Sequence, residues 1–555
     1  MQFKQTPVRL LFLLFPFAAF SQTTYLPQGA KENILIERLE IKRQTDSVLN
    51  FSKNRPFSRK QFIPLIGSID SASLSAADRY NRHTALLSNI EWAPGDAGRY
   101  SSKKPIWKHF YRTPANLYEV STPDFFLAVN PVLQYVIGKE QDNDQRIFLN
   151  TRGVTLRGRI ANKIGFAAYF TDNQERDPLY VQQWVTRADA VPGNGFYKDF
   201  KKTGYDYLDA RGYITFNAAK YIDIQFGYDK NFIGNGYRSL FLSDFSSPAL
   251  FLKLNTRIWK FNYQNLFMEL NSAQRFTADI LIPKKYAAMH HLDIGVTKWL
   301  NVGLFESVVF GRSDHFEFSY LNPVIFYRSV EQQNGSFDNA ILGVDFKANV
   351  AKKFQFYGQM VLDEFNLTEM RKGSGWWGNK YGFQLGAKYI DAFNISNLDL
   401  QLESNRIRPF TYSHRDSVAN YTHYNQPLAH PLGANLQEWI GQVRYQPTPR
   451  LLATARAIYY AQGRDTGMVS GGSNIFLPYD QPFRNRDYGF KIGGPVKGKT
   501  AMVSLLLSYE WRPNLFFELN SVYRKEGATS ISPAASTFVV YAGLRWNMHR
   551  RDFEF

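Results

Sequence analysis

The sequence predicts an all-β fold, namely an antiparallel transmembrane β-barrel of about 18 strands, preceded by a small helical N-terminal segment. Three observations favour this fold class. Aromatic residues are abundant, with 46 Phe, 33 Tyr and 10 Trp among 555 residues. After the N-terminal stretch there is no apolar run of about 20 residues, the length of a membrane-spanning helix, and the mean hydropathy is −0.35. Apolar and polar residues alternate in long segments from residue 117 onward, as they do in strands with two different faces.

Residues 1–21 have the three parts of a secretory signal peptide. Lys4 and Arg9 provide positive charge, residues 10–20 are apolar, and Ala19 and Ser21 are the small residues expected before a cleavage site. The alternative interpretation is a buried N-terminal helix. The apolar stretch is too short to cross a bilayer of roughly 30 Å, and no Cys follows it to carry a lipid anchor. We therefore expect an exported protein that resides in the outer membrane of a Gram-negative cell.

Residues 22–116 predict a mixture of helix and loop, which we expect to form a periplasmic segment that either plugs the barrel or lies below it. Ser75 and Asp78 have the spacing of a capping box at a helix start, although this spacing also arises by chance. Residues 34–41 fit a short helix or an edge strand equally well. Residues 53–60 are basic, and we expect an extended loop that is either solvated or in contact with anionic lipid head groups or a periplasmic polymer.

Residues 117–555 are expected to form the barrel itself. The hairpin over residues 503–520 illustrates the alternation, because one face is apolar and the other is polar. The apolar set comprises Val503, Leu505, Leu507, Tyr509, Trp511, Leu515, Phe517 and Leu519, and the polar set comprises Ser504, Ser508, Glu510, Glu518 and Asn520. A soluble sandwich gives the same alternation, but segments of about 10 residues or more match tilted strands that cross a membrane.

The connections between strands alternate in length as well. Short turns are expected near residues 161–163, 218–221, 257–260, 297–301, 351–353, 391–396, 446–450 and 512–514, and longer loops near 171–207, 229–247, 311–337, 365–379, 405–435, 461–498 and 523–537. Short turns at one end and long loops at the other are typical of outer-membrane barrels. These hairpins give about 16 strands, and a first strand near 124–137 and a last near 537–548 give about 18; 16 strands remain the alternative.

The end of the sequence and its charge indicate possible partners. Phe555 suits recognition by the barrel-insertion machinery, although the apolar phase slips near Arg550 and Arg551. The net charge is +18, and export argues against nucleic acid as the partner. Cationic loops that face anionic lipopolysaccharide explain this charge, as does attraction to an acidic surface polysaccharide. The chain has no Cys, which excludes disulfides and Cys-bound metals.

Several short stretches occur in a recognisable order along nearly all of the mature chain. They are residues 35–41 (LIERLEI), 53–59 (KNRPFSR), 77–81 (ADRYN), 89–92 (NIEW), 229–244 (DKNFIGNGYRSLFLSD), 320–328 (YLNPVIFYR) and 430–435 (HPLGAN). In order and spread these stretches resemble the Bacteroidota form of the Wzi-type capsule assembly proteins, a family that includes the gliding motility RemB-like proteins. The resemblance implies an outer-membrane barrel of about 18 strands with a helical part at the periplasmic end. It also implies a role in holding surface polysaccharide.

The loop over residues 403–438 is the richest polar segment, and we expect it to bind polysaccharide. Guanidinium groups bind carboxylates in a two-pronged manner, and aromatic rings suit the faces of sugars. The expected binding residues in this loop are Arg406, Arg408, Tyr412, His414, Arg415, His423, His430 and Asn435. The alternative is a loop that folds back and plugs the lumen with internal salt bridges. The spacings of the three histidines fit no common metal-ligand motif, so we expect no metal.

Residues 229–244 contribute Tyr237 and Arg238 to the same expected site. Gly234 and Gly236 suggest a tight loop, which we interpret as a packed constriction of the lumen. The chain lacks a G-x-S-x-G nucleophile motif, and residues 465–474 lack the repeated acidic ligands of a calcium loop. We therefore expect no enzymatic activity, no catalytic residue and no cofactor.

Three functions remain open at this point. The first is a non-enzymatic outer-membrane barrel that binds or anchors capsular polysaccharide. The second is a subunit of a larger outer-membrane secretion, gliding or assembly complex, in which the N-terminal segment docks periplasmic partners. The third is a passive channel, because a barrel of about 16–18 strands is wide enough for an aqueous lumen; Phe516 and Tyr357 on the inner face indicate partial filling. The expected partners are surface polysaccharide, lipopolysaccharide or other outer-membrane lipid, the barrel-insertion machinery and other outer-membrane proteins.

Overall fold

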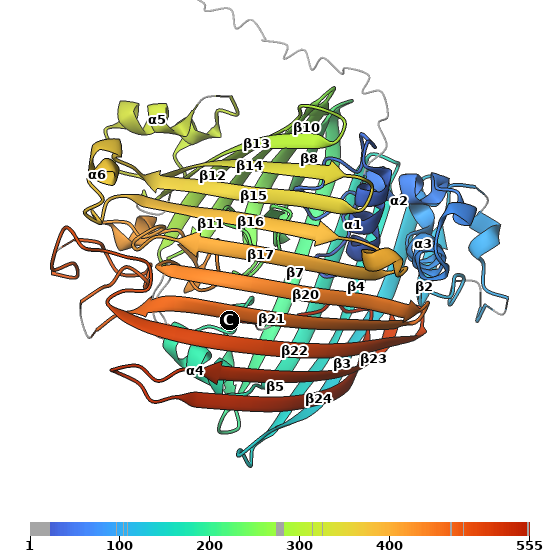
Figure 1. Ribbon diagram of the computed structural model, residues 1–555. Helices are drawn as coiled ribbons and strands as arrows, with labels where there is room; N and C mark the ends of the chain where they lie inside the picture. The colour runs from blue at the N-terminus through green and yellow to red at the C-terminus, as the bar shows by residue number, and fades with distance from the viewer. Residues whose placement is uncertain are drawn as a thin grey trace, which may run out of the picture.

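The chain forms a closed antiparallel β-barrel of 18 strands, which confirms the predicted fold class. The computed structural model describes residues 23–95, 97–103, 105–107, 109–272, 282–312, 315–324, 326–466, 469–480, 482–551 and 554–555. The expected signal peptide, residues 1–21, lies outside the described residues. Figure 1 shows the barrel from the side, with helices at both of its ends.

Nearly all barrel strands pair with the strands that precede and follow them in the sequence. The barrel consists of β3 (Phe125–Glu140), β4 (Arg146–Ile160), β5 (Ile164–Arg176), β7 (Gly204–Ala219), β8 (Ile222–Asp229), β10 (Ala249–Ile258), β11 (Phe261–Asn271), β12 (Lys284–Gly295), β13 (Leu300–Phe310), β14 (Asn339–Val350), β15 (Phe354–Glu364), β16 (Lys380–Tyr389), β17 (Leu398–Ile407), β20 (Leu436–Thr448), β21 (Leu451–Arg464), β22 (Val496–Arg512), β23 (Leu515–Glu526) and β24 (Ala535–Trp546). The short strand β6 (Lys198–Phe200) pairs with β7. Two ribbons lie outside the barrel sheet and join β1 (Asn54–Arg55) to β9 (Phe232–Ile233) and β18 (Thr422–His423) to β19 (Gln426–Pro427).

The last strand closes the barrel against the first. In this pair Val539 lies opposite Glu140, and Trp546 lies opposite Leu133. The short strand β2 (Tyr118–Ser121) pairs with the part of β3 that β24 does not reach. Strand β24 therefore ends before Arg550 and Arg551, where the apolar phase of the sequence slips.

The two faces of the strands differ as the alternation predicts. In β22 the apolar set faces outward, and Val503 and Trp511 are about half exposed, at 51% and 49%. The alternate residues Ser508 and Glu510 are buried toward the interior. The outward apolar side chains form a belt of the kind that a bilayer covers.

The connections confirm the predicted division into a short-turn end and a long-loop end. Every predicted short turn joins two consecutive strands, from residues 161–163 between β4 and β5 to residues 513–514 between β22 and β23. The long connections carry α4 (Leu179–Ala188), η4 (Phe318–Leu321), α5 (Tyr327–Asn334), α6 (Leu367–Arg371) and η6 (Ser417–Ala419), whereas η5 (Ala392–Asn394) lies in a short turn. The prediction did not include two connections at the long-loop end, residues 141–145 between β3 and β4 and residues 272–283 between β11 and β12. In the part of the chain that the structure describes, no helix is long and apolar enough to cross a membrane.

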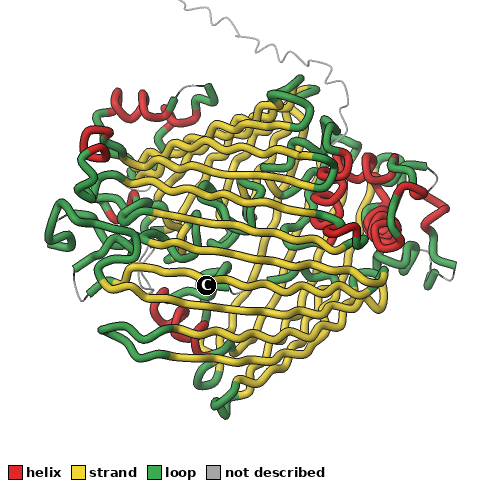
Figure 2. The backbone as a smooth tube through the Cα atoms, viewed as in Figure 1, coloured by secondary structure: helices red, strands yellow, loops and turns green. Residues whose placement is uncertain are grey.

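The N-terminal segment is helical and lies at the short-turn end, as Figures 1 and 2 show. Its elements are α1 (Lys31–Arg43), α2 (Arg59–Ser68), η1 (Ser71–Ser73), α3 (Ala76–Ser88), η2 (Ile90–Trp92) and η3 (Ala97–Tyr100). Residues 34–41 are therefore part of a helix. The Ser75 hydroxyl accepts a hydrogen bond from the Asp78 backbone N–H at 3.0 Å, so the predicted N-cap is present. The Asp78 carboxylate does not return to the cap, because it pairs with Arg38 of α1.

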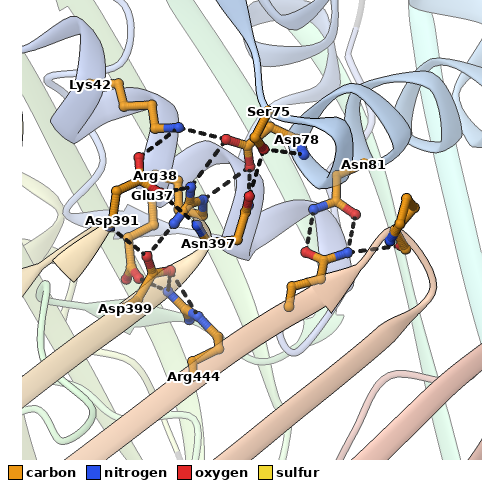
Figure 3. Close-up of polar contacts among 12 residues, drawn as sticks. Glu37, Arg38, Lys42, Ser75, Asp78, Asn81, Asp391, Asn397, Asp399 and Arg444 are labelled. Atoms are coloured by element: carbon orange, nitrogen blue, oxygen red, sulfur yellow. Dashed lines mark hydrogen bonds and ion pairs between the residues drawn. The ribbon is translucent and has the colours of Figure 1, made fainter. Parts of the chain in front are cut away.

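Buried ion pairs fix the helices to the barrel wall (Figure 3). Arg38 lies between Asp78 of α3 and two barrel carboxylates, with Nε 3.0 Å from Asp78 Oδ1 and Nη2 2.8 Å from Asp391 Oδ1; it also pairs with Asp399. Burial alone would raise the pKa of Asp78, but the hydrogen bonds and charges of Arg38 and Lys42 lower it to about 2. A buried charge that loses such partners is strongly destabilising, so this network locks the N-terminal segment onto the barrel.

Residues 53–60 contradict both expectations for the basic stretch, since they are neither solvated nor free to contact lipid. Lys53 is 1% exposed, and its Nζ lies 2.9 Å from Asp293 Oδ1 and also pairs with Asp345. Arg59 is buried as well and donates from Nε to Asn89 Oδ1 at 2.6 Å. The stretch lies inside the molecule because carboxylates on the inner faces of β12 and β14 provide partners for its charge.

Two long connections fold into the interior. Residues 230–248 and residues 408–435 contribute to one apolar cluster with inward-facing side chains of β10–β15. The Tyr412 hydroxyl donates to the Leu240 backbone oxygen at 2.9 Å, and the Tyr421 hydroxyl donates to the Phe241 backbone oxygen at 2.7 Å. The part of the barrel enclosed by β10–β17 and β20 is therefore packed, and we call it the filled half.

The C-terminal tail, residues 547–551 and 554–555, also lies inside the barrel. Phe555 packs against Trp184 of α4 and against Phe245, with ring centroids 5.3 and 5.8 Å apart. The Tyr237 hydroxyl donates to Glu554 Oε2 at 2.7 Å, and Arg456 pairs with the same carboxylate. Phe555 is therefore enclosed, and Trp546 is the aromatic residue at the end of the last strand.

Candidate functional site

Three long connections meet at the long-loop end and form a cluster of aromatic and cationic side chains. They are residues 365–379, 408–435 and 465–495. We call this cluster the rim cluster, and it comprises Trp376, Trp377, Arg408, Arg415, Tyr479 and Arg484. Backbone hydrogen bonds join the first connection to the third, since Trp377 N–H donates to Asp487 O at 3.0 Å and Phe490 N–H donates to Gly375 O at 2.9 Å.

Stacked rings and cations hold the rim cluster together. The rings of Trp377 and Tyr479 lie 4.8 Å apart at an interplanar angle of 37°. The Arg484 guanidinium lies 4.2 Å from the Trp377 ring centroid, and Lys380 Nζ lies 3.8 Å from the Tyr479 centroid. Trp376, Trp377 and Tyr479 are half-buried. Each of these side chains therefore retains some accessible surface, at which a sugar ring could stack.

Exposed charges border these rings. Arg415 is exposed and lies 3.4 Å from Asp480, which is also exposed at its side chain. A surface ion pair of this kind is weak, so the Arg415 guanidinium can exchange its partner for a carboxylate of a ligand. The arrangement can bind a polar, anionic ligand.

Asn435 positions the third connection rather than facing a ligand. Its Nδ2 donates to Gly471 O at 2.8 Å and to Gly494 O at 2.6 Å, and its Oδ1 accepts from Gly493 N–H at 2.8 Å. Its backbone has a φ of 57°, in the left-handed region that Asn tolerates. The residue is fully buried, so this predicted binding residue supports the rim cluster from beneath.

The structure separates the other predicted residues of loop 403–438. Arg408 belongs to the rim cluster, where it donates to Asn379 O at 2.7 Å and lies over the Tyr381 ring; burial lowers its pKa. His414 is buried beside Tyr479, and burial together with Lys380 lowers the pKa of its imidazole. Arg406 is exposed on the outer wall of β17, opposite Phe383 of β16. It does not face the lumen, because it alternates with the inward-facing Asn405.

Tyr412 and His423 lie in the filled half. Tyr412 is buried with its hydroxyl bonded to Leu240 O. His423 Nδ1 accepts from the Asn271 backbone N–H at 3.0 Å, and Nε2 lies 3.0 Å from Pro248 O. Burial lowers the pKa of His423 to about 4. These two residues follow the alternative interpretation of the loop, in which it folds back into the lumen.

His430, Tyr237 and Arg238 belong to one buried polar network. Glu438 Oε2 lies 2.8 Å from His430 Nε2, and Glu438 Oε1 lies 3.1 Å from Arg238 Nη2. Glu403 accepts from the backbone N–H groups of Tyr237 and Arg238 at 2.7 and 3.1 Å. The network joins residues 230–248 to β17 and β20, which agrees with the packed constriction expected for residues 229–244.

The three loop histidines lie at different places, His414 at the rim, His423 against Pro248 and His430 against Glu438. Over the described ranges no group of three or more His, Asp or Glu side chains could hold a metal ion.

The prediction missed Trp376, Trp377, Tyr479 and Arg484. A signal for the first two was present, since a Trp pair flanked by glycines, GSGWWG over residues 373–378, stands in a predicted long loop. Tyr479 and Arg484 have no local signal, because their place beside Trp377 depends on the approach of two separate connections.

The remaining part of the barrel, enclosed by β21–β24, β3–β5, β7 and β8, contains two cavities, and we call it the cavity half. A cavity of about 240 Å³ lies beside the N-terminal segment, with Arg59, Arg157 and Arg211 in its lining. A second cavity of about 150 Å³ lies on the other side of the C-terminal tail, and Arg550 lines both. The tail therefore lies between the two cavities.

The fold and these features define a class of protein, the 18-stranded antiparallel barrels of outer membranes. No family model matches the chain, and no curated protein matches it. Among solved structures the chain is similar to Wzi, an outer-membrane protein involved in group 1 capsule assembly in Escherichia coli and described as a carbohydrate-binding β-barrel. The TM-score is 0.58 at 12% identity, over 96% of this chain and 100% of that chain. The Pseudomonas aeruginosa barrels OprD and OccK8 (OprE) give TM-scores of 0.42 and 0.41 at 12% and 10% identity. They cover 75% and 76% of this chain, and 94% and 98% of their own.

Proposed function

We propose that the chain is a non-enzymatic outer-membrane barrel that binds surface polysaccharide at its long-loop end. The observation that carries the proposal is the rim cluster, where accessible Trp and Tyr rings stand beside guanidinium groups. Aromatic faces and Arg forks together suit an acidic sugar polymer. The whole-length similarity to Wzi, whose description is that of a carbohydrate-binding barrel, supports the proposal.

The same proposal assigns places to the other expected partners. Residues 1–21 direct export, residues 22–116 form the periplasmic segment and residues 117–555 form the barrel. Arg406, exposed on the outer wall, suits contact with lipopolysaccharide phosphate. Trp546 at the end of β24 suits recognition by the barrel-insertion machinery.

The test is the binding of purified barrel to polysaccharide extracted from the surface of the cells that produce it. We expect Trp377→Ala and Arg484→Ala to weaken binding, because each removes one partner of the contact between the Arg484 guanidinium and the Trp377 ring. Trp259→Ala is the matched control, since Trp259 is 77% exposed but lies in a turn at the short-turn end. Equal binding by all three variants and the parent would contradict the proposal.

A second candidate function, that of a channel, rests on the two cavities of the cavity half. The C-terminal tail lies between them, and its Arg550 lines both. Membership of a larger secretion or gliding complex remains the third hypothesis. Co-purification of stoichiometric protein partners in mild detergent would favour it over the binding protein.

A further inference from the structure

The connection between β13 and β14 folds back over the outer wall of the barrel. We call residues 315–324 and 326–338 the flap; they include η4 and α5, and Figure 1 shows α5 outside the strands at the long-loop end. Tyr320, Tyr327 and Val330 of the flap pack against a second apolar cluster. Its wall members are Phe267, Tyr286, Ala288, Val308 and Phe310. These wall residues alternate with inward-facing members of the interior cluster such as Ala287 and Val309, so the flap covers the outward face.

The wall beneath the flap carries a row of polar residues. Asn265, His290 and Glu306 are register partners on β11, β12 and β13, and all three are buried. The next partner of Glu306, Leu342 of β14, is 44% exposed. The row therefore lies at the level of the apolar belt. Burial of a carboxylate at such a position costs free energy unless the carboxylate accepts hydrogen bonds and protein shields it from lipid.

Polar side chains of the wall form hydrogen bonds with the backbone of the flap. Glu306 Oε1 accepts from the Arg328 backbone N–H at 3.1 Å, and the Tyr263 hydroxyl donates to Pro323 O. His290 contacts Tyr327 of the flap, with ring centroids 4.0 Å apart. Irregular backbone at membrane depth is tolerated only where protein satisfies its polar groups, and here the wall supplies those partners.

The flap runs along the wall from the long-loop end toward the short-turn end. At its base Arg312 and Asp338 pair at 2.6 Å, beside the ends of β13 and β14. At its tip Pro323 reaches Tyr263, which lies close to the short-turn start of β11. The tip therefore lies deeper along the belt than the base.

The exposed face of the flap is rich in large apolar side chains. Val324 and Phe326 at the tip are 83% and 71% exposed, and Phe318 and Phe337 are 78% and 83% exposed. Gln332, Gln333 and Asn334 are exposed polar residues at the end of α5. Exposed aliphatic and aromatic side chains on an element that covers the wall match contact with lipid, and the polar end of α5 matches the head-group region.

We propose that the flap is a re-entrant element that enters the membrane from the long-loop side, with Val324 and Phe326 in contact with lipid acyl chains. The polar row on the wall holds it there. The proposal rests on the barrel lying in a membrane and not on polysaccharide binding, so failure of either can be told apart.

Because the chain has no Cys, single nitroxide labels can be placed without removing native thiols. We would label F326C, Q333C and V344C in vesicles of phosphatidylcholine and phosphatidylglycerol and compare the access of oxygen and of a water-soluble nickel chelate by electron paramagnetic resonance. V344C reports the bare belt, since Val344 is an exposed wall residue of β14. We expect the F326C label to favour oxygen as the V344C label does, and the Q333C label to favour nickel.

Nickel access at F326C equal to that at Q333C would place the tip in water and overturn the proposal. Low access of both reagents at F326C would place the tip against protein and overturn it as well. Nickel access at V344C would remove the membrane placement on which the proposal depends.

A second pair of variants tests the wall bonds. Glu306→Leu removes the acceptor for the Arg328 N–H, and we expect the F326C label to become more mobile and more accessible to nickel. Glu306→Gln keeps an acceptor oxygen and is the matched control, with the label unchanged. An unchanged label in Glu306→Leu would show that the polar row does not hold the tip.

Discussion

Strands β10–β17 and β20 enclose a packed interior, whereas the strands of the cavity half enclose two cavities. The inward positions differ accordingly: Phe251 and Leu266 are buried in the apolar cluster of the filled half, and Ser504 and Asn520 line a cavity in the other. Both halves have the same outward apolar belt. The outward residues of the strands are thus apolar in both halves. The inward residues differ between the halves according to which segment folds in beside them.

The difference follows from the segments that enter the interior. The filled half receives residues 230–248 and 408–435, which carry their own apolar side chains into the interior. The cavity half receives α4, which packs in an apolar cluster with Phe555, and the C-terminal tail, whose charged residues Arg550, Arg551 and Glu554 pair with wall residues. The two cavities lie beside this charged part of the tail, because Arg550 lines both.

Deletion of residues 547–555 should have the largest effect on this comparison. It joins the two cavities that Arg550 lines, and we expect ion conductance in planar bilayers that the full chain lacks. Glu554→Ala, which releases Arg456 and Tyr237, should give a smaller increase with less risk to folding. Ile531→Ser in an exposed loop is the control. Identical conductance of all forms would mean that the tail does not separate the cavities.

Removal of one aromatic ring should lower the free energy of unfolding more in the filled half than in the cavity half. Phe241 is fully buried and stacks on Phe305 at 4.5 Å, so Phe241→Ala should cost about 3–5 kcal/mol. Phe516 lines a cavity and is half-buried, so Phe516→Ala should cost about 1–2 kcal/mol. Urea unfolding in detergent measures both. Similar losses would indicate that the cavity half is packed as tightly as the filled half.

The strands were predictable from sequence, but the interior was not. Alternation and turn positions depend on neighbouring residues, which is why Trp511 and Ser508 were assigned to the correct faces. The partners of Lys53, Arg238 and His430 lie on other strands, and a polar loop that plugs a lumen has the same composition as one that binds sugar. The Trp pair at 376–377 is a local sequence signal for the rim cluster, whereas Tyr479 and Arg484 have none.

Acid should weaken the filled half through His423. Burial lowers the pKa of His423 from 6.5 to about 4, so the unfolded state binds the proton more readily. The stability contribution of the neutral ring is complete above pH 6.5, falls as pH decreases, and is lost by about pH 4, a total of about 3 kcal/mol. We expect His423→Gln to reduce the loss of unfolding free energy between these pH values. His83→Gln, at an exposed position, is the control, and an equal pH dependence of parent and His423→Gln would contradict the assignment.

The smallest expected effect concerns single hydroxyl groups that join the two inward loops of the filled half. Tyr412→Phe removes the donor to Leu240 O, and Tyr421→Phe removes the donor to Phe241 O. Each leaves a buried carbonyl without that partner, and each should cost about 1–2 kcal/mol in the free energy of unfolding. Tyr459→Phe, on the exposed outer wall, should cost close to nothing. Because the two donors bridge the same pair of loops, the double variant should lose more than the sum if the loops separate together. Strict additivity would show instead that packing of the apolar cluster, and not these hydrogen bonds, keeps residues 408–435 against residues 230–248.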